Sequence, residues 1–413
     1  MIQIQPASHP PRKGTRIGLA IAGGGPIGGM YELGALRALD DAIEGLDLAR
    51  LEVYVGVSSG AFLAAGLANR MSTEEMCRIF ITGQDDRLHF HPESFLRPAC
   101  GEFVRRTSRL PGLLSGWARD AITRGRSTRL SDVMVRFSAL IPPGLFDNTG
   151  VERFLREVFS IRGRSNDFRN LPAPLYVIAV DINTGATVRF GGKGWDDIPI
   201  SRAVQASGAM PGLYPPVEIR GHQFVDGALR RTMHASVAMG HGVDLLLGIN
   251  PMVPFDADAA HVSGRKRTNL VDGGLPVVLS QAVRTILQSR AQVGLSRYRS
   301  EYPATDQVFL EPDASDRRTF FTNVFSFGSR FAICQHAYRA TLNDLAARRH
   351  ELAPLLARHG LELRPQVIDD PTRTLLAGMD GRTHRTDTTE RLRRALDDVE
   401  ALLRRRRHAQ RIA

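Results

Sequence analysis

Cysteine is scarce in this sequence, and its few copies suggest neither disulfides nor metal binding. The 413 residues include three cysteines, Cys77, Cys100 and Cys334, which are widely spaced and form no C-x-x-C pair. This usage excludes a disulfide framework and is typical of reduced thiols. His89 and His91 form an H-x-H pair, but no further carboxylate or thiol partners stand at metal-binding spacing, so we expect no metal site.

Long apolar runs are missing as well. No stretch approaches the ~20 apolar residues that a membrane-spanning helix needs. The first 14 residues, MIQIQPASHPPRKG, have neither the apolar segment nor the small-residue cleavage site of a signal peptide. We therefore expect a cytoplasmic protein whose contact with a membrane is at most peripheral.

The composition is that of a folded, basic protein. Hydrophobic residues make up 43% of the chain and charged residues 23%, which is enough apolar material for a sizeable core and excludes general disorder. The net charge of +11 comes mainly from arginine. A basic surface attracts nucleic acid or anionic lipid headgroups. No recognised nucleic-acid motif accompanies the charge, so we expect no nucleic-acid partner.

Strands and helices alternate along the first part of the chain. Residues 16–22 and 51–57 are short apolar runs that read as buried strands, and each is followed by glycines or serines and then by a helical pattern. This alternation predicts an α/β fold with a mainly parallel sheet covered by helices. Further strands are predicted at 173–182, before Asp226, and at 243–250.

Composition also divides the chain into parts. We expect a flexible leader over residues 1–14, an α/β domain over 15–255, and a mainly helical extension over 256–413 that packs on this domain. Within the domain, residues from about 85 to 150 read as an inserted helical cap. Between Arg97 and Arg136 the cap carries nine arginines against three acids, with apolar residues interleaved. The cap is either a solvated helical face or a surface that contacts anionic membranes.

The first motif with chemical content is Gly56-Val57-Ser58-Ser59-Gly60, a G-x-S-x-G between the strand at 51–57 and a helix. A serine at a sharp strand-to-helix turn is held exposed, and the flanking glycines let the backbone bend and pack closely. The dipole of the following helix favours negative charge at the serine. The alternative is a glycine-rich turn with no chemistry.

The second motif is the glycine loop Gly23-Gly24-Gly25-Pro26-Ile27-Gly28-Gly29, which also lies between a strand and a helix. Its backbone N–H groups can bind an anion, either the phosphates of a dinucleotide or the oxyanion of an acyl-transfer intermediate. A dinucleotide site requires an acid at the end of the next strand. That strand ends instead in the serine turn, which favours acyl transfer.

Two further segments follow in the chain. Asp226-Gly227-Ala228 places an acid at a strand end, although a D-G pair is more often a plain turn. Residues 206–212, Ala-Ser-Gly-Ala-Met-Pro-Gly, are small and rich in bends, which suits close packing against the wall of a site.

These four motifs, in this order, resemble the patatin-like phospholipase family over roughly residues 15–255. The resemblance implies a three-layer α/β/α sandwich with a mainly parallel central sheet and a helical cap. It also implies that Ser58 is a nucleophile and Asp226 the base of a Ser-Asp dyad. The backbone of Gly23, Gly24 and Gly25 would line an oxyanion hole. Four further glycines support the motifs: Gly28, Gly56, Gly60 and Gly227.

The sequence departs from the family at Ile27, where the family usually has Arg or Lys. The departure removes a fixed charge near the glycine loop and bears on substrate orientation more than on the dyad. A Ser-Asp-His triad is a poorer fit, because the histidines that follow Asp226 stand in no distinctive setting. They are His234, His241, His261, His336 and His350.

The sequence therefore predicts a serine lipid acyl hydrolase that acts on phospholipids or related lipids without a cofactor. The alternatives are a non-catalytic lipid-binding relative, an acyltransferase or polyester depolymerase, and, less favoured, a nucleotide-binding oxidoreductase that uses the glycine loop.

Overall fold

The computed structural model describes most of the chain. The described residues are 1–8, 15–83, 142–262, 269–321 and 329–379, with a few positions between 88 and 115. Most of the predicted cap and the end of the chain from residue 380 lie outside the described residues. The chain divides into two compact units, Met1–Leu375 and Leu376–Ala413, and the sheet, its helices and the candidate site all belong to the first.

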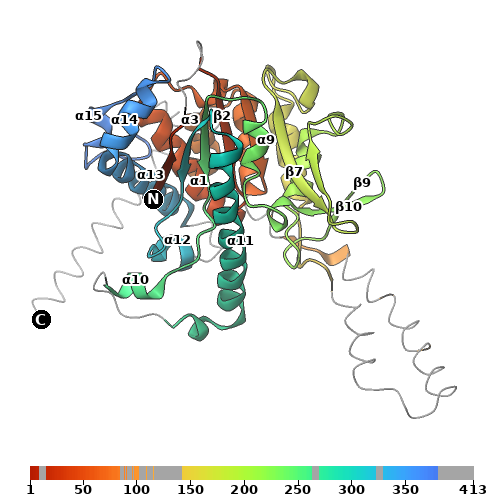
Figure 1. Cartoon of the computed structure of the whole chain (residues 1–413). Coiled ribbons are helices and arrows are strands. Elements are labelled where there is room, and N and C mark those ends of the chain that lie inside the picture. The colour runs from red at the N-terminus through yellow and green to blue at the C-terminus, as the bar shows by residue number, and fades with distance from the viewer. Residues whose placement is uncertain are drawn as a thin grey trace, which may run out of the picture. The chain divides into compact units, whose positions relative to one another are not determined.

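Within the described residues, a nine-stranded sheet lies at the centre of the first unit (Figure 1). Its order is β1-β12-β11-β2-β4-β7-β10-β9, and β8 pairs with β7. The central strands from β12 to β7 are parallel, whereas β1, β8 and β10 run antiparallel to the neighbours that link them to this group. The strands are β1 (Ile2–Gln5), β2 (Ile17–Ile21), β4 (Val53–Val57), β7 (Leu175–Asp181), β8 (Thr187–Phe190), β9 (Val217–Ile219), β10 (His222–Asp226), β11 (Leu245–Ile249) and β12 (Asp306–Leu310).

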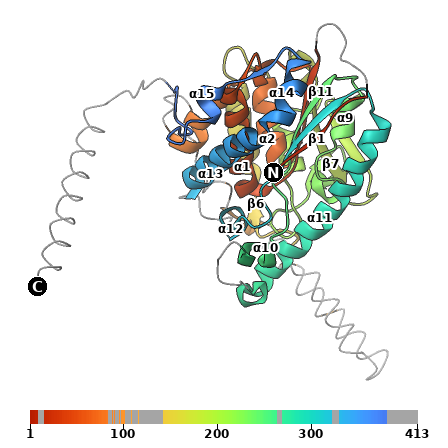
Figure 2. The same cartoon turned by 60° about the vertical axis from the view of Figure 1, so that its left-hand side comes forward.

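Helices cover both faces of this sheet, which makes a three-layer α/β/α sandwich (Figures 1 and 2). One face packs against α9 and α11, with Val55, Leu246 and Phe309 of the sheet meeting Met239 and Leu287 of the helices. On the other side, α1 packs against α2 and α13. The longer helices are α1 (Gly25–Ala42), α2 (Ser59–Ala68), α7 (Thr149–Phe159), α8 (Ile200–Ser207), α11 (Gly274–Glu301), α13 (Arg330–Ala347) and α14 (Arg349–Ala357), and the shorter ones are α3 (Thr73–Cys77), α9 (Ala235–Met239), α10 (Ala257–Val262), α12 (Arg317–Phe321) and α15 (Pro365–Ile368).

The central strands form where the sequence has unbroken apolar runs. Every residue of β4 and of β11 is buried. Strands that are covered on both faces need apolar side chains on both sides, so they read as continuous hydrophobic segments. The mainly parallel α/β fold predicted from these runs is therefore confirmed.

Two expected boundaries are wrong. Residues 1–14 were expected to form a flexible leader, but Ile2–Gln5 form β1, which pairs with β12 at the sheet edge and buries Ile2. Residues 256–413 were expected to form a helical extension, but β12 lies inside the sheet between β1 and β11. Both corrections have the same cause: short strands are stabilised by ladder partners that are distant in sequence, which a local pattern does not reveal.

Candidate active site

Ser58 stands at the sharp turn between β4 and α2. Its backbone has φ 53° and ψ −121°, a conformation that residues other than glycine rarely adopt. Close packing on both sides holds this turn. Gly60 lies against the backbone carbonyls of β2, and Gly56 lies against the backbone of Ala61, so a side chain at either glycine would clash. The predicted serine turn therefore has the strained geometry that exposes a serine hydroxyl.

Ser207, at the end of α8, ties this turn to the sheet. The Ser58 N–H donates to Ser207 Oγ at 2.8 Å, and the Ser207 hydroxyl donates to the carbonyl of Ile178 in β7 at 2.5 Å. Ser207 is fully buried. Close packing was expected from residues 206–212, but the hydrogen bonds that Ser207 makes to Ser58 and Ile178 were not. A small polar residue inside an otherwise small and apolar segment was the available signal.

The glycine loop lies directly against Ser58. A Cβ placed on Gly23 would lie 2.9 Å from Ser58 Cβ and 3.3 Å from Ala228 Cβ. The absence of a side chain at Gly23 thus lets three motifs, far apart in the chain, meet at one point. The predicted convergence of the glycine loop, the serine turn and the Asp-Gly-Ala segment is present in the backbone.

The backbone N–H groups of Gly23, Gly24 and Gly25 differ in whether a protein acceptor already engages them. The Gly23 N–H donates to the carbonyl of Thr232 at 3.4 Å, and the Gly24 N–H donates to Ser59 Oγ at 2.9 Å. Gly25 is the first residue of α1, where the helix itself gives its N–H no acceptor. Gly25 has φ 62° and lines the pocket beside Ser58. Of the three glycine amides, those of Gly23 and Gly24 are therefore engaged within the described structure, whereas Gly25 begins a helix and lines the pocket.

Glu32 of α1 completes this arrangement and was not predicted from the sequence. The Ser59 hydroxyl donates to Glu32 Oε1 at 3.1 Å, while Glu32 Oε2 is buried without a hydrogen-bond partner in the described structure. Burial raises the pKa of Glu32 well above its usual value, and the Ser59 hydrogen bond opposes this only in part. Glu32 therefore fixes Ser59, which in turn fixes the Gly24 amide.

Ile27 is buried in the first turn of α1. The position where the family usually has a charge is thus a buried apolar side chain, and Pro251, which follows β11, packs on the loop at Gly24 and Gly28.

Asp226 ends β10, and the strand register brings it level with Ser58. Val57 pairs with Ile178, and Asp226 pairs with the next residue of β7, Ala179. β10 runs antiparallel to β7. Ser58 and Asp226 stand on either side of β7, roughly 10 Å apart at the backbone by strand spacing.

The Asp226 carboxyl is fully buried. Its Oδ1 accepts the Ala228 N–H at 2.8 Å. Desolvation raises the pKa of Asp226 to about 6, and the Ser58 hydroxyl is close enough to lower it in part. Oδ2 nevertheless has no aligned hydrogen-bond donor among the described residues. The Ser58 hydroxyl and the Asp226 carboxyl are neighbours.

Among the described residues, no histidine lines the pocket at Ser58 as the third member of a catalytic triad would. His234 is buried, and desolvation lowers its pKa to about 4. It hydrogen-bonds to the backbone of Gly227, so it supports the Asp-Gly-Ala turn in its neutral form. His241 pairs with the hydroxyl of Tyr176, and His336 pairs with Asp316.

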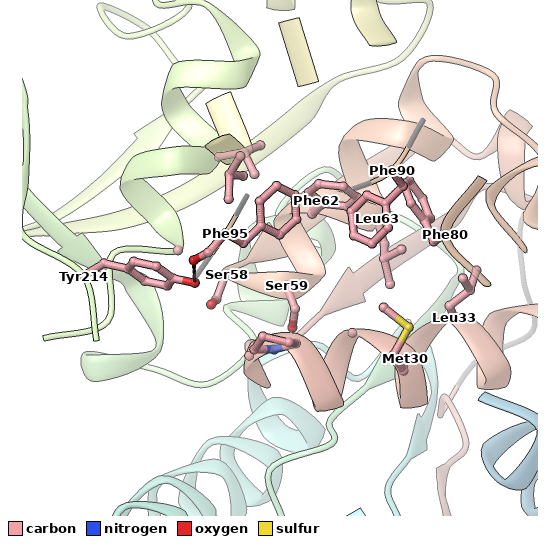
Figure 3. Close-up of a pocket in the computed structure, with 16 residues that line it drawn as sticks. Met30, Leu33, Ser58, Ser59, Phe62, Leu63, Phe80, Phe90, Phe95 and Tyr214 are labelled. Atoms are coloured by element: carbon pink, nitrogen blue, oxygen red, sulfur yellow. Dashed lines mark hydrogen bonds between the residues drawn. The ribbon is translucent and has the colours of Figure 1, made fainter. Parts of the chain in front are cut away.

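An apolar pocket opens above Ser58 (Figure 3). Phenylalanine side chains form one wall: the rings of Phe62 and Phe80 meet edge to face at 5.1 Å, and Phe90 and Phe95 do so at 5.3 Å. The Tyr214 hydroxyl donates to the Phe95 carbonyl at 3.0 Å and closes one side. The opposite wall and floor come from Gly25, Pro26, Gly29, Met30, Leu33, Ser58, Ser59 and Leu63.

The serine turn occupies the place where a dinucleotide site would require an acid, because the strand after the glycine loop, β4, runs directly into Ser58. Within the described residues, no group of three or more His, Cys, Asp or Glu could hold a metal ion. Cys77 and Cys334 are buried, Cys100 is exposed, and all three are free thiols.

A three-layer α/β sandwich with a strained serine turn at the carboxyl edge of its parallel strands is typical of α/β hydrolases. The family model for patatin-like phospholipases matches residues 19–239, more than half of the chain. The chain therefore belongs to the patatin-like phospholipase family, a family of lipid hydrolases.

Solved structures with similarity to this chain include two bacterial effectors. VipD from Legionella pneumophila is 14% identical, with 87% of this chain and 82% of VipD covered and a TM-score of 0.31. The ExoU–SpcU complex from Pseudomonas aeruginosa matches at 16% identity, with 90% and 73% covered and a TM-score of 0.25.

Human GIVD cytosolic phospholipase A2, in complex with methyl gamma-linolenyl fluorophosphonate, is 15% identical, with 63% of this chain and 46% of that chain covered and a TM-score of 0.22. The comparison with curated protein sequences gave no match. The family assignment rests on the family model.

Proposed function

We propose that this chain hydrolyses acyl esters of phospholipids or related lipids through an acyl-enzyme, with Ser58 as nucleophile and Asp226 as base. The observation that carries the proposal is the close approach of Gly23 to both Ser58 and Ala228, where an added Cβ would lie 2.9 Å and 3.3 Å from their Cβ atoms. This approach, beside an apolar pocket that Ser58 and Gly25 line, supports a shared position for the hydroxyl, the Asp226 carboxyl and the loop amides.

Each residue has a defined task in this reaction. Asp226, whose pKa is raised to about 6, is ionised at neutral pH and is a stronger base than an exposed aspartate. It takes the Ser58 proton as the oxygen attacks the ester carbonyl, and the Gly25 amide meets the oxyanion. On collapse, Asp226 gives this proton to the departing alcohol and is again a carboxylate. It then takes a proton from the water that attacks the acyl-Ser58 ester, and the second collapse returns the proton to Ser58 as the fatty acid leaves.

The pocket indicates the kind of substrate. Its wall of phenylalanines and its apolar floor suit an acyl chain, which gains from leaving water. Hydrolysis of a lipid ester rather than a polar ester is therefore the activity we infer. The same pocket would serve transfer of the acyl group to an alcohol, which a product analysis distinguishes from hydrolysis.

Labelling of the full chain with a fluorophosphonate, followed by peptide mapping, tests the nucleophile. We expect the label on Ser58, its loss in Ser58→Ala, and its retention in Ser160→Ala, an exposed serine on another surface. Asp226→Asn should lower ester hydrolysis by about 100-fold or more while the protein stays folded. A folded Ser58→Ala variant that is still labelled or fully active would refute the proposal.

A further inference from the structure

Helix α11 is long, apolar and largely uncovered. Together with the preceding turn, the helix runs from Leu270 to Glu301. By length and composition alone it could cross a membrane, which was not expected from the sequence. Only 11% of its most apolar stretch is buried. Figures 1 and 2 show its N-terminal part running past the edge of the sheet.

The exposed apolar residues of α11 fall on one side of the helix. Leu275, Leu279, Ile286 and Val293 are 76%, 58%, 59% and 60% exposed. Their spacings of four, seven and seven residues keep them in one narrow line along the helix, here called the α11 stripe. The buried residues of α11, among them Leu287 and Leu295, follow a different line that faces the core.

The other side of α11 is firmly attached to the protein. Arg284 is buried and donates to the carbonyls of Pro251 and Val253 at 3.3 Å and 3.1 Å, and Leu287 accepts the Thr232 hydroxyl at 3.2 Å. A bilayer-spanning arrangement would remove these contacts and place a buried arginine in lipid. The helix is therefore suited to lie on a membrane rather than to cross it.

Positive charge accompanies the C-terminal half of the stripe. A hollow there is lined by Arg230, Arg231, Arg290 and Arg297, with Glu301 as its acid. Arg297 pairs with Glu301 at 2.7 Å, and Arg290 donates to the carbonyl of Leu229. The hollow therefore keeps an excess of positive charge beside exposed apolar side chains.

We propose that the α11 stripe and this arginine hollow form a membrane-binding surface for anionic lipid bilayers. The apolar side chains of the stripe would enter the boundary of the acyl chains, and the arginines beside them would contact the anionic headgroups. A second copy of the chain fits less well, because a symmetric interface would bring the same arginines together. The proposal concerns binding and holds whether or not the chain is an active hydrolase.

Vesicle sedimentation with the full chain tests this surface. Ser58→Ala serves as the background, so that lipid stays intact. We expect binding to phosphatidylcholine vesicles that contain phosphatidylserine, with weaker binding to pure phosphatidylcholine and at high salt. Leu279→Ser with Ile286→Ser should lower the partition coefficient by about tenfold or more. Arg231→Gln with Arg290→Gln, both in the arginine hollow, should lower it on anionic vesicles only.

Ile182→Ser is the matched control, because Ile182 is 50% exposed and lies outside α11. Unchanged binding of the Leu279→Ser, Ile286→Ser variant, or an equal loss in Ile182→Ser, would overturn the proposal. So would a wild-type dimer in sedimentation velocity that the stripe variant dissociates, since the occupant would then be a second copy. Hydrolysis of a soluble short-chain ester by the stripe variants, made with Ser58 intact, reports separately on the catalytic proposal.

Discussion

The Ser59 hydroxyl accepts the Gly24 amide at 2.9 Å and donates to the buried carboxyl of Glu32 at 3.1 Å. Ser59, the residue after the candidate nucleophile, therefore holds the glycine loop, and Glu32 holds Ser59. Glu32 lies on α1, the helix that begins in this loop. This contact fixes the loop in the absence of substrate and leaves Gly25 to face the pocket.

Removing the acid should therefore loosen the loop. Glu32→Gln keeps an acceptor for Ser59 at the same place, so we expect kcat within about threefold of wild type. Glu32→Leu removes the acceptor, and we expect kcat to fall by about tenfold or more with little change in KM, since the Gly25 donor is displaced. Steady-state kinetics on a soluble ester measures both. Equal losses in the two variants would assign Glu32 a purely structural role.

Ser207 should matter for both stability and rate. Ser207→Ala leaves the Ser58 amide and the Ile178 carbonyl unpaired in the core, which costs about 1–3 kcal/mol of unfolding free energy. It also frees the strained turn, so kcat should fall. Ser201→Ala, at the other end of α8, removes a buried hydroxyl that bonds to Glu152 and Asn166. It should destabilise the fold to a similar degree but leave kcat unchanged, as urea unfolding and kinetics can show.

The pH dependence of activity should follow Asp226. The carboxyl must be ionised to accept the Ser58 proton, and burial raises its pKa to about 6. We therefore expect kcat/KM to rise with pH through about pH 6 and to level off above it. A profile that rises near pH 4 would mean that Asp226 is solvated in the free enzyme, and no dependence at all would remove it from the mechanism.

The same raised pKa predicts a change in stability with pH. Below about pH 4 the carboxyl is protonated in both the folded and unfolded states. As pH rises from 4 through 6, the unfolded state ionises first, so the wild type loses about 3 kcal/mol of stability. Asp226→Asn does not titrate. Its unfolding free energy relative to wild type should therefore increase by about 3 kcal/mol between pH 4 and pH 8, which urea unfolding at the two pH values measures.

Chain-length preference should depend on the phenylalanine wall. Phe62→Ala opens the pocket where its ring stacks on Phe154 at 6.1 Å. We expect kcat/KM to fall by about tenfold for long-chain esters and much less for a four-carbon ester, because only the long chain reaches the lost surface. A uniform loss across chain lengths would instead indicate a general disturbance of the site.

Much of this arrangement was predictable from local patterns. Apolar runs identified β2, β4, β7 and β11, and the helical patterns that follow the first two runs identified α1 and α2. Glycines beside Ser58 marked the sharp turn, because few other residues permit its close packing. The edge strand β1 and the inserted strand β12 escaped prediction, since each is short and its ladder partners are distant in sequence: β1 pairs with β12, and β12 also pairs with β11.

The sequence by itself determined the order of the motifs and the residue types that can carry acyl-transfer chemistry, because those properties are local. The tertiary structure decided which groups meet. It buried Asp226 and so raised its pKa, engaged the Gly24 amide with Ser59, and selected Glu32 and Ser207 as partners from distant helices. It also left one line of α11 uncovered. Burial, hydrogen-bond partners and exposed faces depend on the packing of the whole chain, and no local pattern contains that information.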